Sequence, residues 1–248
     1  MRLLRLGNSY ETDANIAADD NKVAVSERLL GQALGEDVET TSRVIWPGPE
    51  LPELIDRWLD RYDPDIALLI VSSYWFTNVS LPLQLERRFG RVGKAVARRG
   101  ELLVRNPRLA RNPVFERARQ SARKRLGGAT HFTPEYINEL METCIRRILL
   151  REQVALVVRG PRLAFAFEDT PKSKRLAEER RQIVHRRLRE LCAQLHIEYI
   201  GYESAQAPQD ARSEFQDDLV HATTAVHAEQ GEIEAEALIA AWRSQHPA

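Results

Sequence analysis

Residues 66–71 read Ile-Ala-Leu-Leu-Ile-Val, a run of six apolar side chains without polar alternation. Residues 154–158 read Val-Ala-Leu-Val-Val and follow the same pattern. A strand that is apolar on both sides is buried on both faces, as in a parallel sheet covered by helices. Shorter apolar runs at 2–6, 43–46 and 197–200 predict three further strands. The sequence therefore predicts a five-stranded parallel sheet.

Amphipathic helical patterns lie between or after these strands, at residues 23–34, 51–62, 174–195 and 233–242. Strands that alternate with helices of this length are typical of an α/β fold with right-handed crossovers. The longest pattern predicts a surface helix that buries one apolar stripe and exposes Arg and Glu. The stripe consists of Leu176, Ile183, Val184, Leu188, Leu191, Cys192 and Leu195.

A long helical stretch at 82–150 interrupts this alternation, because one crossover helix would be enough between the third and fourth strands. Residues 86–126 hold 14 Lys and Arg but 3 Asp and Glu, a local charge of +11. The whole chain balances 36 basic against 36 acidic side chains, so the remainder carries about −11. We predict a single domain over 1–248 with an Arg-rich helical insertion at about 80–150.

Composition limits the class of protein. Hydrophobic residues make up 43% of the chain, enough for a substantial core. Cys144 and Cys192 are the two cysteines, which excludes a disulfide scaffold and a cysteine-rich metal site and favours a reducing compartment. Neither a signal-peptide pattern nor an apolar run of bilayer length is present, so we expect a cytoplasmic protein.

A candidate nucleophile follows the first predicted strand, in Gly7-Asn8-Ser9. Ligands of open parallel sheets bind at the carboxyl ends of the strands, and Ser9 comes directly after such an end. A serine hydroxyl needs an imidazole to take its proton, so this interpretation requires a histidine from elsewhere in the chain. The alternative is a turn glycine followed by a capping serine.

The candidate base lies in Asp218-Leu219-Val220-His221, just before the last helix. The Asp-x-x-His spacing lets a short loop bring the carboxylate to one ring nitrogen while the other faces outward, as a general base requires. The alternative is that Asp218 or Thr223 caps the last helix and His221 lies on the surface.

Four blocks together resemble the SGNH (GDSL-type) hydrolases over most of the chain outside the insertion. The resemblance implies a three-layer α/β/α fold like that of flavodoxins and serine-dependent ester hydrolysis. The sequence has neither a Gly-rich phosphate loop nor a His, Asp or Glu cluster with metal-ligand spacing, so we expect no cofactor or metal. The resemblance makes Ser9 the nucleophile, His221 the base and Asp218 its orienter, with the N–H groups of Ser9 and Gly48 in the oxyanion hole. Thr223 and His227 extend the match at the C-terminus. The blocks are residues 6–9, 46–49, 64–66 and 218–221.

Two blocks depart from the family pattern. Asn8 replaces the usual aspartate, which is a mild change because the triad acid comes from the last block. Residues 72–78 read Ser-Ser-Tyr-Trp-Phe-Thr-Asn, with Tyr74 where the family has the asparagine of the oxyanion hole. Asn78 could supply the amide from a shifted loop, or Ser72, Ser73 or Tyr74 could donate a hydroxyl. The alternative is that residues 74–76 pack beneath the insertion.

The basic insertion could bind phosphate backbones or anionic head groups. Phe89 and Phe115 are its two rings between residues 86 and 126, too few for a base-stacking platform, so nucleic acid is not expected. We interpret it as a helical lid whose arginines pair with acidic groups, within the chain or in a homo-oligomer. The sequence thus predicts an esterase, lipase or acetyl-esterase acting on a small-molecule ester. The rival hypothesis is a catalytically weak binding or scaffold protein whose insertion holds an anionic partner.

Overall fold

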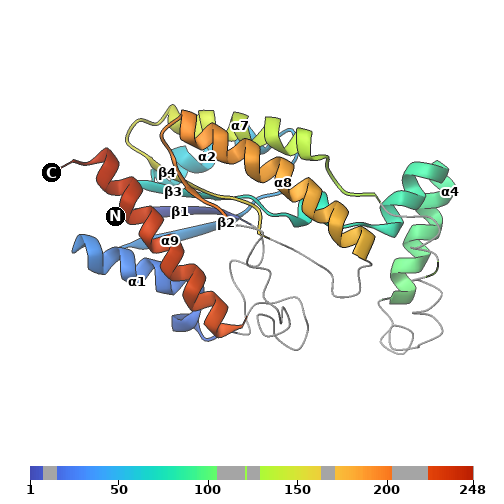
Figure 1. Cartoon of the computed structure of the whole chain (residues 1–248), viewed down its shortest axis with the longest axis horizontal. Helices are drawn as coiled ribbons and strands as arrows, with labels where there is room; N and C mark the ends of the chain where they lie inside the picture. The colour runs from blue at the N-terminus through green and yellow to red at the C-terminus, as the bar shows by residue number, and fades with distance from the viewer. Residues whose placement is uncertain (8–15, 105–120, 122–128, 163–170, 203–222, 248) are drawn as a thin grey trace. The chain divides into compact units, whose positions relative to one another are not determined.

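The computed structural model describes residues 1–7, 16–104, 121, 129–162, 171–202 and 223–247. The chain divides into two compact units, one of residues 1–73 and 134–248 and the other of residues 74–133. The first unit contains the sheet and the helices that cover it (Figure 1). Each unit is considered by itself below.

Five parallel strands form the sheet, in the order β2-β1-β3-β4-β5. The predicted α/β class with a five-stranded parallel sheet is confirmed. β3 lies at the centre and is buried throughout, as its uninterrupted apolar run predicted. The strands are β1 (Arg2–Gly7), β2 (Glu39–Val44), β3 (Ile66–Ile70), β4 (Ala155–Arg159) and β5 (Glu198–Ile200).

The second strand lies earlier than the apolar run at 43–46 predicted. β2 begins at Glu39, and its side chains up to Ser42 are polar. It pairs with β1 at the edge of the sheet, where backbone hydrogen bonds to one neighbour hold it and little apolar burial is required. The apolar residue Ile45 follows the strand and is buried there. Hydrophobicity therefore marked the end of this edge strand and missed its start.

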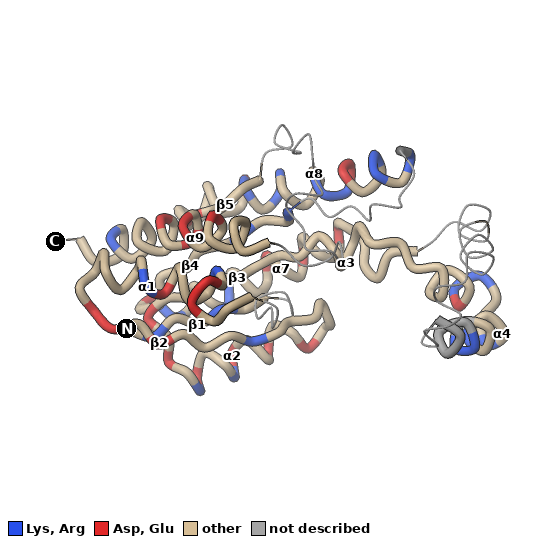
Figure 2. Tube along the Cα trace, turned by 90° about the horizontal axis from the view of Figure 1, so that it is seen from below, with Lys and Arg blue, Asp and Glu red and all other residues tan. Residues whose placement is uncertain are grey.

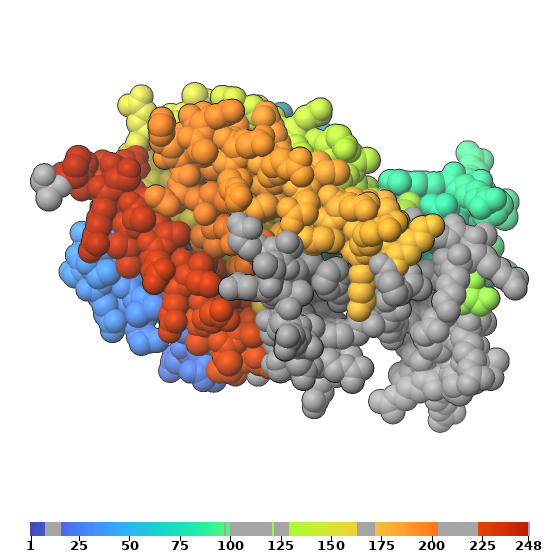
Figure 3. All heavy atoms as spheres, viewed as in Figure 1, coloured from blue at the N-terminus to red at the C-terminus, as the bar shows by residue number. Residues whose placement is uncertain are grey.

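Helices cover both faces of the sheet (Figure 1). On one face α1 (Lys22–Leu34) packs along α9 (Thr224–Gln245), and the space-filling view shows the two side by side (Figure 3). On the other face α2 (Leu51–Tyr62), α7 (Pro134–Leu149) and α8 (Pro171–Gln194) pack in sequence. The result is the predicted three-layer α/β/α arrangement.

The predicted stripe of α8 is buried only in its later part. Val184, Leu188, Leu191 and Cys192 are buried, whereas Leu176 and Ile183 are exposed. Closer to the start of α8, the buried residues are the small Ala177 and the charged Arg181. The hydrophobic pattern could not predict the burial of Arg181, because its hydrogen bonds to backbone carbonyls compensate it.

The second unit begins with α3 (Tyr74–Thr77) and contains α4 (Leu81–Val104). An antiparallel bridge between Ser80 and Ala129 joins the two ends of this unit. α4 is kinked at Gly90, whose φ of 55° and ψ of −129° interrupt the helix. After the kink the helix lies so close to the preceding turn that a Cβ at Gly93 would collide with the carbonyl of Leu85. No helix in the described part of the chain is long and apolar enough to cross a membrane.

Candidate active site at the carboxyl edge of the sheet

The strand order creates a switch point between β1 and β3. From β1 the chain passes to β2 on one side and then to β3 on the other, and ligands of open parallel sheets bind at the carboxyl ends of the strands at such a switch point. β1 ends at Gly7, two residues before Ser9. Ser9, Asp218 and His221 lie outside the described residues, so their mutual geometry stays a prediction.

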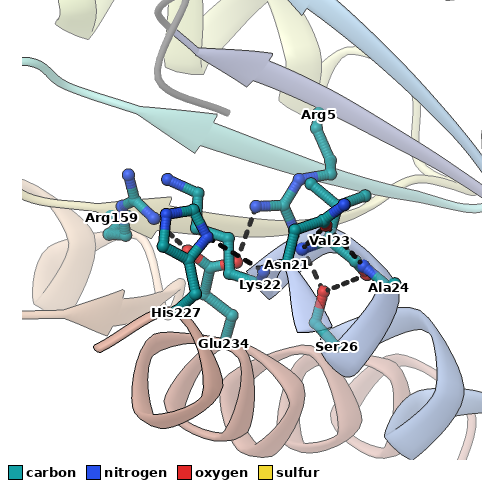
Figure 4. Close-up of polar contacts among 9 residues, drawn as sticks. All are labelled: Arg5, Asn21, Lys22, Val23, Ala24, Ser26, Arg159, His227 and Glu234. Carbon is teal, nitrogen blue, oxygen red and sulfur yellow. Dashed lines mark hydrogen bonds and ion pairs between the residues drawn. The ribbon is translucent and has the colours of Figure 1, made fainter. Parts of the chain in front are cut away.

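A buried ion cluster lies on the α1/α9 face of the sheet and joins β1, β4 and α9 (Figure 4). Arg5 of β1 donates from Nη2 to Oε2 of Glu234 at 2.6 Å, and both side chains are 0% exposed. Arg159, at the end of β4, donates from Nη1 to Oε1 of the same carboxylate. Arg5 also donates to Ser26 Oγ of α1 at 3.2 Å. Because β1 and β4 are the two neighbours of the central strand β3, one carboxylate of α9 binds an arginine from the strand on each side of β3.

His227, near the start of α9, is used as a helix cap. Its Nδ1 accepts the N–H of Lys22, the first residue of α1, at 3.3 Å. The Oδ1 of Asn21 accepts the next two N–H groups, from Val23 at 2.9 Å and Ala24 at 3.0 Å (Figure 4). Backbone N–H groups in the first turn of a helix have no partner within the helix, and these side chains supply one. Buried His227 therefore joins the start of α9 to the start of α1.

Thr223 occupies the N-cap position of α9 but makes no capping hydrogen bond with its side chain. The start of this helix is held instead by His227 and, two turns later, by Glu234. α9 also begins nine residues before the predicted 233, so it follows His221 after only two residues. The chain segment that precedes α9 is thus attached to a fixed helix end.

Arg181 of α8 holds the carboxyl ends of two strands. Its buried guanidinium donates from Nη1 to the carbonyl of Tyr202 at 2.9 Å and to that of Pro161 at 3.3 Å. Pro161 follows β4 and Tyr202 follows β5. Glu178 accepts from Nε at 2.8 Å and from Nη2 at 2.7 Å. Burial alone would raise the pKa of Glu178, but the hydrogen bonds from Arg181 and Gln182 lower it overall.

Gly48 lies in a tight turn after β2. Its N–H donates to the carbonyl of Trp46 at 2.7 Å, and its own carbonyl accepts the N–H of Leu51 at 3.1 Å. The carboxylate of Glu50 fills the space where a Cβ would stand, so only glycine fits this position without displacing that side chain. The N–H that the oxyanion-hole prediction requires is therefore already donated within the turn.

The third block is divided between the two units. Ser72 and Ser73 follow β3 in the first unit and are buried. Tyr74 belongs to the second unit and is exposed, with its ring stacked on that of His131 at a centroid distance of 6.2 Å. Trp75 and Phe76 are buried, as the packing alternative for residues 74–76 requires, whereas the exposed Tyr74 does not fit it.

Asn78 also lies in the second unit, directly after α3, where its N–H donates to the carbonyl of Tyr74 at 3.3 Å. Its side chain is half-buried. The role of Asn78 as a third oxyanion donor stays a prediction. Within the first unit, the hydroxyls that directly follow β3 belong to the buried Ser72 and Ser73.

The two thiols are poor nucleophiles. Cys144 and Cys192 are buried and not joined to each other, and burial raises the pKa of each to about 12. Very little thiolate exists at neutral pH under these conditions. In the described part of the chain, no group of three or more His, Cys, Asp or Glu residues is arranged to hold a metal ion.

Sequence reasoning missed the buried arginines and their partner, although the sequence contained signals for two of them. Arg5 interrupts the apolar run of the first strand between Leu4 and Leu6. Glu234 precedes Leu238 and Ala241 by four and seven residues, so it shares their buried helix face. A charged residue on each of two apolar faces predicts that the two form a pair. Nothing in the sequence indicated that Arg181 would be buried.

Neither a scan against protein-family models nor a search of curated proteins finds a match. Solved structures do match over nearly their whole length. A putative GDSL-like lipase from Parabacteroides merdae is 12% identical, with a TM-score of 0.58 over 97% of this chain and 95% of its own. TesA is 11% identical, with a TM-score of 0.56 over 97% and 99%. The psychrotrophic esterase EstA from Pseudoalteromonas sp. is 8% identical, with a TM-score of 0.54 over 98% of both chains. The chain therefore has the three-layer α/β/α fold of these esterase and lipase structures.

Proposed function

We propose that this chain is a serine-dependent ester hydrolase of the SGNH (GDSL) type, with Ser9 as nucleophile, His221 as general base and Asp218 as its orienter. The observation that carries the proposal is the cluster of Arg5, Glu234 and Arg159. It fixes the strand that ends two residues before Ser9 to the helix that begins three residues after His221.

Chain length limits how far these groups can lie from the fixed elements. Two residues of extended chain span at most about 7 Å, so Ser9 must remain near the end of β1 at Gly7. The same limit applies to His221, which is two residues before Thr223 at the start of α9. The described residues on either side of the segment that contains Asp218 and His221 are both anchored: Arg181 binds the carbonyl of Tyr202, and α9 is bound through Glu234.

The proposed reaction begins when Ser9 Oγ attacks the carbonyl carbon of the ester while His221 takes the hydroxyl proton. The tetrahedral intermediate then collapses, the alcohol leaves with that proton, and an acyl ester of Ser9 remains. His221 next takes a proton from water, whose oxygen attacks the acyl carbon. The carboxylic acid is released, and the proton returns from His221 to Ser9.

The negative oxygen of each intermediate requires hydrogen-bond donors. The N–H groups of Ser9 and Gly48 fill this role in our proposal, with Asn78 or one of the buried serines, Ser72 and Ser73, as the third donor. Gly48 would exchange its bond to the Trp46 carbonyl for one to the substrate. Loss of one such donor typically lowers turnover by about 100- to 1,000-fold, so this exchange bears directly on the rate.

Small acyl esters, acetylated sugars and lipid esters all fit this chemistry. The unpaired thiols of Cys144 and Cys192 agree with a reducing, cytoplasmic location. The buried thiols also leave serine as the nucleophile that the proposal needs, because their raised pKa suppresses the thiolate.

The test is hydrolysis of p-nitrophenyl acetate and butyrate by the wild type and by the variants Ser9→Ala, His221→Ala and Asp218→Asn. We expect each to lower kcat by at least about 1,000-fold with an unchanged circular dichroism spectrum. Ser244→Ala, which removes an exposed hydroxyl from the end of α9, is the control and should keep full activity. Unchanged activity in Ser9→Ala would overturn the proposal. An inactive wild type would favour the binding or scaffold alternative.

A further inference from the structure

The part of α4 that follows the kink at Gly90 is unusually exposed. Among its described side-chain positions, 91–96 and 98–99, only Gly93 is buried. Helices in folded proteins gain most of their stability from packing of one face, so a helix this exposed needs a partner surface. Lys and Arg are spread along this helix (Figure 2). Arg87 and Arg88 precede the kink, and four cations follow it: Arg91, Lys94, Arg98 and Arg99.

Apolar side chains are exposed on the same helix. Val92 is 70% exposed and Val96 53%, and Phe89, directly before the kink, is 51% exposed. Val92 and Val96 are one turn apart and share a face, whereas Arg91, Lys94 and Arg98 recur at intervals of three and four residues on a different face. An exposed apolar stripe beside a cationic stripe is the pattern of a helix that lies in a membrane interface.

Few of these cations have a partner of opposite charge. Among the described residues, Lys94 pairs with Glu86 at 3.1 Å, while Arg91, Arg98 and Arg99 form no ion pair. Arg87 donates to the carbonyl of His131 at 3.4 Å. The described part of α4 therefore presents uncompensated positive charge to solvent.

We propose that α4 binds the surface of an anionic lipid bilayer, with its cations at the headgroup phosphates and Phe89, Val92 and Val96 at the boundary with the acyl chains. Each Lys or Arg near such a surface adds about fivefold to the affinity, and apolar side chains add to this by burial. The proposal goes beyond ester hydrolysis and does not depend on Ser9. If both proposals hold, this helix brings the hydrolase to its lipid surface.

Two other occupants fit less well. Single-stranded nucleic acid is usually held by cations together with stacking rings, and Phe89 is the sole ring of α4. The phosphates of a duplex would match the cations but would leave the exposed Val92 and Val96 in water. A second copy of this helix would bring like charge against like charge, because residues 86–126 carry +11. An anionic bilayer satisfies both the charge and the exposed apolar stripe.

The test is flotation of the full chain with vesicles of phosphatidylglycerol and phosphatidylcholine, compared with phosphatidylcholine alone, at about 150 mM salt. We expect binding to the anionic vesicles only. The triple variant R91Q/K94Q/R98Q should bind about 100-fold more weakly. The variant V92S/V96S should bind about 10-fold more weakly at unchanged charge.

A matched control removes three cations from α8 instead, in K172Q/R180Q/R186Q, and should bind as the wild type does. Ser9→Ala should also bind normally, which separates this proposal from the hydrolase proposal. Absence of flotation with anionic vesicles, or equal flotation of the R91Q/K94Q/R98Q variant, would overturn it. If vesicle binding is absent, salt-sensitive binding to duplex DNA would identify nucleic acid as the occupant of α4. A dimer that the V92S/V96S variant no longer forms would identify a second copy of the chain instead.

Discussion

Arg5 and Glu234 are 229 residues apart in the chain, yet Nη2 of the arginine lies 2.6 Å from Oε2 of the glutamate with both side chains fully buried. A buried ion pair of this kind contributes little net stability compared with apolar residues of the same volume, but breaking it leaves an uncompensated charge. Here it defines the position of α9 relative to β1. In our account that relationship brings the base toward the nucleophile.

Glu234→Gln should strongly destabilise the fold, because both Arg5 and Arg159 lose the carboxylate between them. We expect a loss of about 3–5 kcal/mol in the free energy of unfolding, measured by urea denaturation. Glu236→Gln, an exposed position on the same helix, should change it by less than about 0.5 kcal/mol. Equal stability of the two variants would show that the buried cluster does not hold α9.

Arg181→Lys should impair activity more than stability. Lysine keeps the charge but cannot hold Glu178 and the carbonyls of Pro161 and Tyr202 at once. The backbone at Tyr202, from which the chain continues toward His221, should then shift, and we expect kcat to fall by about 10- to 100-fold. Arg180→Lys, one residue earlier, is the control. The role of Arg181 in positioning the loop would be refuted by a kcat that does not change.

How much of this molecule the sequence predicted depends on which force holds each part. The continuous apolar runs of β3 and β4 predicted two central strands within one residue of their observed ends. Edge strand β2 was placed too late, because backbone pairing rather than burial holds it. Buried Arg181 was missed for a similar reason, since hydrogen bonds compensate its burial. Residues Ser9 and His221 remain predictions from motif and connectivity.

The imidazole of His131 should titrate below its ordinary range, because burial, together with the nearby Arg87, lowers its pKa. The folded pKa is then below the unfolded value of 6.5, so this group stabilises the fold fully above about pH 6.5. That contribution is lost as the pH falls through the folded pKa. NMR titration of the ring should give a midpoint below 6.5.

Arg87→Gln should move this midpoint part of the way back toward 6.5, because burial, the larger cause, remains. Arg88→Gln removes a neighbouring cation and should leave the midpoint where it is. A midpoint of 6.5 or above in the wild type would contradict the partial burial of His131 within the second unit.

The two cysteines should be unreactive in the folded protein. Burial raises the pKa of Cys144 and of Cys192 to about 12, so little thiolate is present and reagents have no access. Ellman's reagent should react slowly in buffer and rapidly in urea, and it should not affect ester hydrolysis in the folded state. Rapid labelling of the native protein with loss of activity would point to thiol chemistry instead.

The central claim is that Ser9 is an activated nucleophile at the carboxyl end of β1. A fluorophosphonate probe reports this directly, because it reacts with a serine whose proton is taken by a neighbouring base. The account predicts one adduct per chain, located by peptide mass spectrometry on Ser9, and its loss in Ser9→Ala and His221→Ala. An adduct on another residue, or no labelling of the folded wild type, would contradict the account.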